Sequence, residues 1–146
     1  MQDPEEKAAA FFDNGYSCSQ SILMTFGPQI GMTENDAAKV ASAFGGGIAR
    51  SGETCGAVSG SLMVLGLKFG SGMNLNKDFV YQKASEFTKR FESKYGSLKC
   101  KQLIKYDISN SPEYQAARES QVFKKICPNL VQSAASILNN MLEKEL

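Results

Sequence analysis

The residues of this chain best suited to covalent chemistry are its four cysteines, Cys18, Cys55, Cys100 and Cys127. They are separated by 37, 45 and 27 positions, so the chain has no C-x-x-C pair of the thioredoxin or zinc-ribbon kind. Three interpretations stay open. The cysteines could form reversible disulfides, they could together ligate one metal ion or iron–sulfur cluster, or they could be buried thiols that act as small hydrophobic side chains.

The chain contains no histidine, and its charge is nearly balanced. The lack of histidine excludes histidine-ligated zinc or haem, Cys-His nucleophile pairs and the Ser-His-Asp triad. The 16 basic and 15 acidic residues give a formal net charge of +1, which produces no overall field to attract nucleic acid or an anionic membrane. We therefore expect no nucleic-acid partner and no membrane insertion.

The N-terminal segment and the apolar runs bear on the cellular location. The sequence MQDPEEKAAAFF is acidic before it becomes apolar, so we expect no secretory signal. The longest uncharged, apolar-rich run ends at Lys68 and is interrupted by glycines, whereas a membrane span needs ~20 residues. We expect a cytoplasmic protein, in which thiols are normally reduced.

One cysteine stands where a glycine-rich segment meets an apolar one, in FGGGIARSGETCGAVSGSLMVLGLK, residues 44–68. The segment 45–54 lacks the Gly-Lys-Ser/Thr ending of a phosphate-binding loop. It is either a flexible turn or a backbone that approaches a neighbour closely, with Arg50 as a candidate anion partner. Thr54 is the candidate cap of the following helix, which puts Cys55 in the first helical turn.

Two glycines in that helix are unfavourable for helix formation. Gly56 and Gly60 each lower helix propensity by up to ~1 kcal/mol relative to alanine. We expect another element to pack closely against the cysteine at these positions, because such packing would offset the loss.

The other cysteines also stand near predicted helix starts. Ser17 and Gln20 form the S-x-x-Q capping box, so that Cys18 should be the first helical residue. A helix dipole and free backbone N–H groups stabilise a thiolate at such a position and lower its pKa.

The last two cysteines follow the same pattern. Ser97 is the candidate cap that would put Cys100 at the third helical position, between Lys99 and Lys101. Pro128 fits the first position of the last helix, with Cys127 as its N-cap. The basic neighbours of both cysteines would stabilise their thiolates further.

Helical periodicity dominates the remaining sequence, and no segment alternates for long enough to predict a strand. The longest amphipathic stretch ends at Tyr95 and places Phe79, Phe87 and Phe91 on one face, which we interpret as core. We predict an all-α fold, a single domain over residues 1–146 with six to eight helices around one core.

With CGAVSG at residues 55–60 and single cysteines before and after it, the chain resembles the redox-active proteins of the C_GCAxxG_C_C family. Cys18 corresponds to the first cysteine of that pattern, Cys55 to the central motif, and Cys100 and Cys127 to the last two. The order here is Cys-Gly-Ala, a variant of the Gly-Cys-Ala in the family label. The resemblance covers nearly the whole chain, and its specificity lies in the four cysteines together with GETCGAVSG.

The resemblance implies a redox role for the cysteines and names no substrate. A similar domain looks to precede haem-binding segments in some split-Soret-type cytochromes. This chain has neither C-x-x-C-H nor histidine, so covalent haem is not expected. The relation keeps electron transfer or an iron–sulfur site as an alternative.

We predict that Cys18, Cys55, Cys100 and Cys127 undergo reversible thiol–disulfide chemistry, in thiol oxidoreduction or in electron transfer. The first-choice pair is Cys18 with Cys55, and the other two would form a second pair or a relay. Four cysteines allow three pairings, and the sequence does not choose between them. A thiol–disulfide oxidoreductase is therefore one candidate, and whether the protein is an enzyme stays open.

Two alternatives remain. All four cysteines could ligate zinc or an iron–sulfur cluster, which requires their sulfurs to converge. The protein could instead be a non-catalytic helical interaction module, which predicts scattered and inert cysteines. The sequence establishes no cofactor, and zinc or an iron–sulfur cluster is the one that the metal-binding alternative would require. The partner would be an unidentified thiol or electron-transfer protein, and the helices rich in small residues could also pack between copies of the chain.

Overall fold

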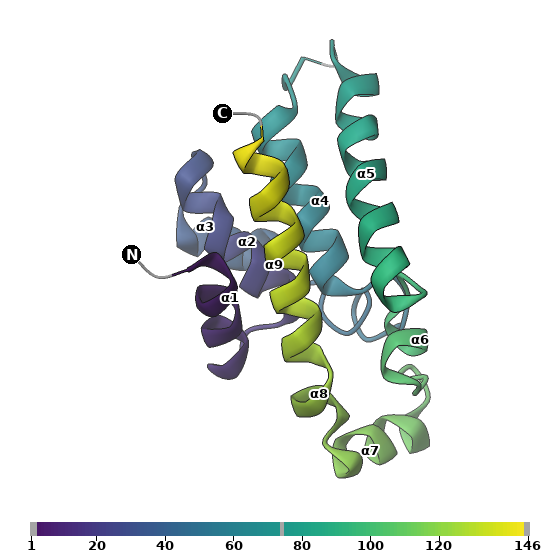
Figure 1. Ribbon diagram of the computed structural model, residues 1–146. Helices are drawn as coiled ribbons and strands as arrows, with labels where there is room; N and C mark the ends of the chain where they lie inside the picture. The colour runs from purple at the N-terminus through teal and green to yellow at the C-terminus, as the bar shows by residue number, and fades with distance from the viewer. Residues whose placement is uncertain (1–2, 74, 145–146) are drawn as a thin grey trace.

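The computed structural model describes residues 3–73 and 75–144, which are helical over most of their length (Figure 1). Eight α-helices in these ranges have five residues or more, α8 is a single turn, and η1 is a short 3-10 helix. The all-α prediction with six to eight helices is confirmed. The elements are α1 (Pro4–Asp13), α2 (Cys18–Phe26), η1 (Gly27–Ile30), α3 (Glu34–Val40), α4 (Gly56–Phe69), α5 (Lys77–Tyr95), α6 (Cys100–Ile104), α7 (Ser111–Ser120), α8 (Val122–Lys125) and α9 (Cys127–Glu143).

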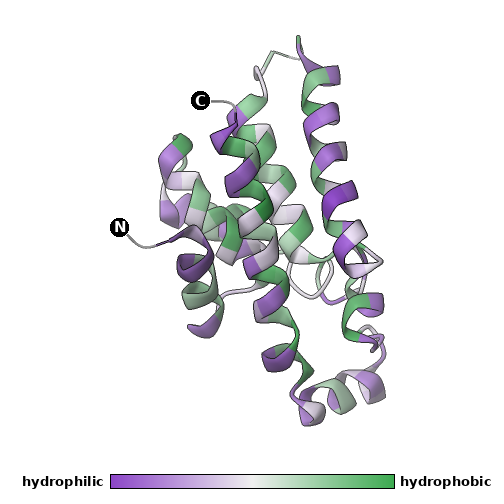
Figure 2. Ribbon diagram, in the orientation of Figure 1, coloured by the Kyte–Doolittle hydropathy of each residue, from purple (hydrophilic) through white to green (hydrophobic). Residues whose placement is uncertain are grey.

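The main core is formed by α1, α2, α4, α5 and α9, which pack against one another. Figure 2 shows α4 mostly in hydrophobic colours, whereas α5 carries many hydrophilic residues. The predicted core face of α5 is confirmed at Phe87 and Phe91, which are fully buried, but Phe79 is 40% exposed. Within the described residues, no helix is both long enough and apolar enough to cross a lipid bilayer.

The start of α2 follows the predicted capping box. The Gln20 backbone N–H donates to Ser17 Oγ at 3.3 Å, and the Ser17 N–H donates to Gln20 Oε1 at 3.0 Å. The buried Ser19 hydroxyl donates to the Ala41 carbonyl oxygen at 3.0 Å. The bond from Ser19 to Ala41, the C-cap of α3, holds the first turn of α2 against the end of α3. Breaking it would leave a buried hydroxyl without a partner, which is costly.

A second, smaller hydrophobic cluster lies at the end of the molecule formed by α6, α7 and α8 (Figure 1). Phe12 and Cys18 pack against both this cluster and the main core. The junction between the two clusters is therefore at the start of α2. The buried members of the small cluster are Cys100, Ile104, Ile108, Ala117, Val122 and Cys127.

Candidate functional site

Each of the four cysteines lies at the start of a helix, within one or two residues of its predicted position. Cys18 is the first residue of α2, as predicted. Cys55 is itself the N-cap of α4, so the prediction of Thr54 as the cap is wrong by one residue. Cys127 is the first residue of α9 rather than its N-cap, because the backbone of Ile126 before it is already in the right-handed helical region.

The start of α6 differs more from its prediction. We predicted Cys100 at the third helical position after a Ser97 cap, but α6 begins at Cys100 itself. The Ser97 hydroxyl is bonded to the Gln102 side chain and accepts from the Lys99 N–H at 3.0 Å. The chain at Lys99 is still extended, so the helix cannot begin before the cysteine.

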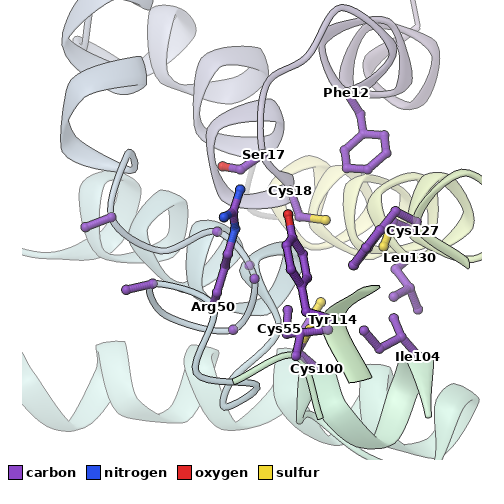
Figure 3. A pocket seen from close by; sticks show the side chains of 18 of the residues that line it. Phe12, Ser17, Cys18, Arg50, Cys55, Cys100, Ile104, Tyr114, Cys127 and Leu130 are labelled. Atoms are coloured by element: carbon purple, nitrogen blue, oxygen red, sulfur yellow. The ribbon is translucent and has the colours of Figure 1, made fainter. Parts of the chain in front are cut away.

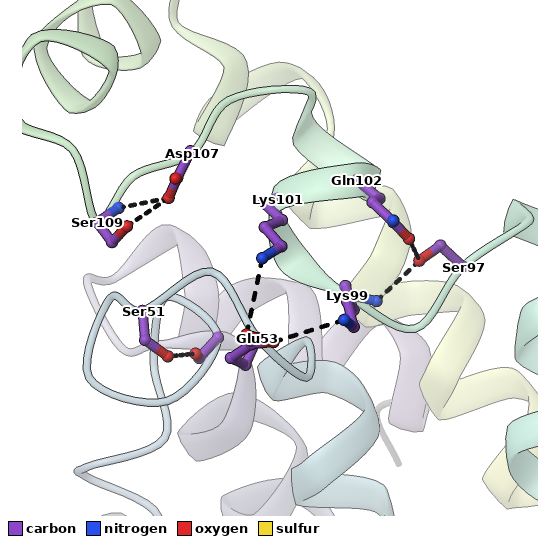
Figure 4. A network of polar contacts seen from close by, with 9 residues as sticks. Ser51, Glu53, Ser97, Lys99, Lys101, Gln102, Asp107 and Ser109 are labelled. Atoms are coloured by element: carbon purple, nitrogen blue, oxygen red, sulfur yellow. Dashed lines mark hydrogen bonds and ion pairs between the residues drawn. The ribbon is translucent and has the colours of Figure 1, made fainter.

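An isolated antiparallel bridge joins Thr54 to Lys99, the residues that directly precede Cys55 and Cys100. Figure 4 shows Lys99 beside Glu53, the residue before Thr54. The Cys55 N–H donates to the Leu98 carbonyl oxygen at 2.8 Å, and the Cys100 N–H donates to the Glu53 carbonyl oxygen at 2.7 Å. Two segments that are far apart in the sequence are thus aligned with one cysteine on each.

Ion pairs flank this bridge. The Glu53 carboxylate lies 3.9 Å from Lys99 Nζ and 3.7 Å from Lys101 Nζ. All three side chains are partly exposed, so each pair contributes at most ~1 kcal/mol of stability. The two lysines expected to act on Cys100 are therefore paired with a carboxylate.

The glycines of α4 allow α2 to approach closely, as predicted. A Cβ atom on Gly56 would lie 2.8 Å from the Ser19 backbone nitrogen and 3.2 Å from Cys18 Cβ. A Cβ atom on Gly60 would lie 2.8 Å from the Ser19 carbonyl oxygen. Larger residues would hold the two helices apart, so these glycines bring the first turn of α2 against the start of α4.

All four cysteines line one pocket of about 650 Å³ (Figure 3). Cys55, Cys100 and Cys127 are 3%, 8% and 6% exposed, whereas Cys18 is half-buried. All four thiols are free. The prediction of scattered cysteines that accompanied the interaction-module alternative is therefore wrong.

The glycine-rich segment forms a left-handed turn along one wall of this pocket. Five consecutive residues, 46–50, have φ between +50° and +70°, and three of them are not glycine. A Cβ atom on Gly47 would lie 2.7 Å from Cys100 Cβ, and one on Gly45 would lie 2.8 Å from Ser17 Cβ. The expected close backbone approach is present, and the neighbours are the helix starts that carry Cys100 and Cys18.

Comparison with known protein families gives one match. The family model described as "Putative redox-active protein (C_GCAxxG_C_C)" matches residues 16–141. The chain belongs to the C_GCAxxG_C_C family. Searches of curated proteins and of solved structures gave no match. The match includes all four cysteines and the CGAVSG segment, so the cysteine pattern of this family corresponds here to residues that line a single pocket.

In this C_GCAxxG_C_C protein, the pKa values of the Cys18 and Cys55 thiols move in opposite directions. A hydrogen bond from the Cys18 thiol lowers the pKa of Cys55, and the backbone N–H groups of Ala57 and Val58 lower it further, against the effect of burial. The pKa of Cys18 is raised well above its usual value by its hydrogen bonds with Cys127 and Cys55, and then by burial. Cys55 is therefore the favoured thiolate of the pair.

The prediction that every cysteine would have a stabilised thiolate is wrong for Cys18 and for Cys100. Burial raises the pKa of Cys100 to about 12, and the nearby Cys55 and Cys127 sulfurs raise it as well. Burial at this position outweighs the effect of a helix start, since taking a charged group out of water is costly.

The arrangement around the cysteines also bears on metal binding. Within residues 3–73 and 75–144, no group of three or more cysteine, aspartate or glutamate side chains is placed to hold a metal ion. The four-cysteine zinc or iron–sulfur alternative therefore gains no support from the positions of the sulfurs, although all four border the same pocket.

Two features of the site were not foreseen from the sequence. One is the proximity of Cys18 and Cys127, which line the same pocket although they are 109 positions apart in the chain. The other is Tyr114 of α7, which lines the pocket and lies under the Arg50 guanidinium, with 4.9 Å from Arg50 Cζ to the ring centroid. No local pattern marks a tyrosine in a short amphipathic helix as part of a site.

Proposed function

We propose that this protein carries out reversible thiol–disulfide exchange, with Cys55 as the attacking thiolate and Cys18 as the resolving thiol. The observation that supports the assignment most directly is the close approach of the two helix starts, since a Cβ atom on Gly56, the residue after Cys55, would lie 3.2 Å from Cys18 Cβ. The interaction between the two thiols lowers the pKa of Cys55 and raises that of Cys18. One member of the pair is thus suited to attack, and the other keeps its proton until the second step.

The exchange balances without any further cofactor. The Cys55 thiolate attacks one sulfur of an oxidised substrate, R–S–S–R, and forms a mixed disulfide while one R–S⁻ leaves. The Cys18 sulfur then attacks Cys55 Sγ and releases the second R–S⁻, which takes the proton that Cys18 loses. The first R–S⁻ takes from water the proton that Cys55 lost when it ionised. Two protein thiols are oxidised to one disulfide, and the substrate is reduced to two thiols.

The remaining cysteines have different positions relative to this pair. Cys127 packs beside Cys18 and raises its pKa, which suits a relay in which Cys127 attacks Cys18 Sγ of the first disulfide, breaks the Cys18–Cys55 bond and releases Cys55 as a thiolate. Cys100 has a pKa raised to about 12, so it stays protonated at neutral pH and is a poor nucleophile. We assign the relay to Cys127 and no exchange step to Cys100.

Disulfide mapping tests this assignment. Fully reduced protein is treated with less than one equivalent of diamide, the remaining thiols are blocked with N-ethylmaleimide, and the bridged peptides are identified by mass spectrometry. We expect the Cys18–Cys55 disulfide to form first. In the Cys18→Ser variant, Cys55 should form no disulfide within the same reaction time. The Cys100→Ser variant should form the Cys18–Cys55 disulfide at the wild-type rate.

Two results would refute the assignment. One is a first disulfide between Cys100 and Cys127, and the other is a protein in which no intramolecular disulfide forms although its thiols are consumed. Elemental analysis of anaerobically purified protein is the accompanying control, because stoichiometric zinc or iron with four protected thiols would favour the metal alternative.

A further inference from the structure

The pocket restricts what can reach the reactive sulfurs. Cys55 is 3% exposed and Cys127 is 6% exposed, and both border the pocket. A cavity of about 650 Å³ has the size of an ordinary small-molecule site. An oxidant has to enter this pocket to reach Cys55, which favours one that is small or that carries its disulfide on a thin extension.

The chemistry of the pocket walls further limits the ligand. Among the described residues that line the pocket, Arg50 is the one with a charged side chain. The other lining residues are cysteines, glycines, serines, Tyr114 and apolar side chains that include Phe12, Ile104 and Leu130. Such a pocket favours a ligand with an apolar body and one anionic group, because the guanidinium is the only strong counter-charge it offers.

The Arg50 guanidinium is available for this role. Its side chain is exposed, and no ion pair or hydrogen bond of its guanidinium is found among residues 3–73 and 75–144. Its one described interaction is with the Tyr114 ring, 4.9 Å from Arg50 Cζ, and Figure 3 shows the two side chains next to each other at the pocket. Stacking on an aromatic ring orients a guanidinium while its N–H donors stay free to bind a carboxylate in a bidentate manner.

The backbone that carries Arg50 is held in an unfavourable conformation. Ile48, Ala49 and Arg50 have φ values of 66°, 50° and 61°, a region that residues with a Cβ atom seldom occupy. Backbone bonds maintain the turn, among them the Arg50 N–H to the Gly45 carbonyl oxygen at 3.1 Å. Strained backbone of this kind clusters at sites that hold ligands. Here it fixes Arg50 on the pocket wall that the glycine-rich turn forms.

We propose that the pocket binds a low-molecular-weight disulfide that carries a carboxylate, with Arg50 binding the carboxylate and the disulfide facing Cys18 and Cys55. This inference rests on the proposed exchange between Cys55 and Cys18 and follows the same two steps. The small disulfide is the oxidant, it receives two electrons and two protons, and it leaves as two thiols. Arg50 is a binding residue and takes no part in the proton or electron transfers.

Two small disulfides of similar size test the proposal. 3,3′-Dithiodipropionate carries carboxylates, whereas bis(2-hydroxyethyl) disulfide is neutral. Reduced protein is mixed with each at the same pH and ionic strength, and formation of the Cys18–Cys55 disulfide is followed by quenching and mass spectrometry. The measured quantity is the ratio of the two second-order rate constants.

We expect the wild-type protein to prefer the carboxylate probe by about tenfold, the effect of one charge-assisted hydrogen-bonded pair. Arg50→Gln should reduce the ratio to about one, and Arg50→Lys should restore part of it. Lys89→Gln removes the same charge from an exposed position on α5 and should keep the wild-type ratio. Circular dichroism of each variant shows whether the helices are intact.

The possible results separate the two proposals. Equal rates for both probes in the wild-type protein, with no change in Arg50→Gln, would overturn the anionic ligand while leaving the exchange itself intact. Failure of both probes to form the Cys18–Cys55 disulfide would instead overturn the proposed function. If Lys89→Gln lowered the ratio as much as Arg50→Gln, the preference would come from the overall charge, and Arg50 would lose its assigned role.

Discussion

At the scale of single residues, the pKa values of two cysteines in the same pocket, Cys18 and Cys55, are shifted in opposite directions. Burial raises the pKa of both Cys18 and Cys55, and a helix start is available to both. The difference comes from the interaction between the two thiols, which raises the pKa of Cys18 and lowers that of Cys55, so that one sulfur keeps its proton while the other is stabilised as a thiolate. Backbone N–H groups at the start of α4 add to the effect on Cys55.

A pair of substitutions at Cys18 tests this explanation. Cys18→Ala removes the donor, so the pKa of Cys55 should rise, and its alkylation by iodoacetamide at neutral pH should slow several-fold. Cys18→Ser keeps a hydroxyl donor and should keep the pKa of Cys55 low. The pH dependence of Cys55 alkylation, resolved by peptide mass spectrometry, gives both values. Equal midpoints for the alanine variant, the serine variant and the wild type would show that the Cys18 thiol does not act on Cys55.

At the scale of helices, the site depends on the close contact of α2 with α4. The contact is made possible by Gly56 and Gly60, where a Cβ atom would lie 2.8 Å from backbone atoms of Ser19. Backbone atoms cannot move aside as the end of a flexible side chain can, so the two helices would have to separate. Glycine at these two positions lowers the helix propensity of α4 but allows Cys18 and Cys55 to lie close together.

Two glycine-to-alanine substitutions in the same helix should have opposite effects on stability. Gly56→Ala should lower the free energy of unfolding by ~1–3 kcal/mol, as overpacking of a core does, and should slow formation of the Cys18–Cys55 disulfide. Gly66→Ala should raise it by up to ~1 kcal/mol, because nothing lies within 4 Å of the added Cβ atom and helix propensity improves. Denaturant unfolding of the reduced proteins measures both, and a destabilised Gly66→Ala would argue against the explanation.

At the scale of the whole molecule, the four cysteines lie where the two hydrophobic clusters meet. Cys55 belongs to the main core and Cys100 and Cys127 to the smaller cluster, while Cys18 packs against both. Burial at this junction makes the protonation of the thiols part of the free energy of folding.

The protein should become less stable at high pH because of Cys100. Its pKa is raised from 9.0 to about 12 in the folded state, so the unfolded chain loses this proton first and the contribution to stability falls as pH rises above 9.0. Between pH 9 and 10 the free energy of unfolding should fall by about 1 kcal/mol more in the wild type than in Cys100→Ala. Denaturant titrations of both proteins over this range measure the difference, and parallel curves would contradict the buried, protonated thiol.

Much of the local structure followed from the sequence alone. The all-α class, the capping box at Ser17 and Gln20, the placement of each cysteine within two residues of a helix start, and family membership all depend on residues close together in the chain or on the cysteine pattern. Caps and helical periodicity act over about four residues, so they can be identified without knowing the tertiary contacts. The exact caps of α4, α6 and α9 differed because the bridge from Thr54 to Lys99 and the turn before Cys127 extend or shorten the first turns.

Only the tertiary structure decided which sulfurs meet and which of them ionises. The contact of Cys18 with both Cys55 and Cys127 requires α2 to pack on α4 and α9, and Arg50 meets Tyr114 only because the turn at 46–50 lies against α7. Burial raised the pKa of Cys100 in spite of its position at a helix start and the lysines beside it. Desolvation depends on every element packed around a group, and for that reason no local pattern could predict it.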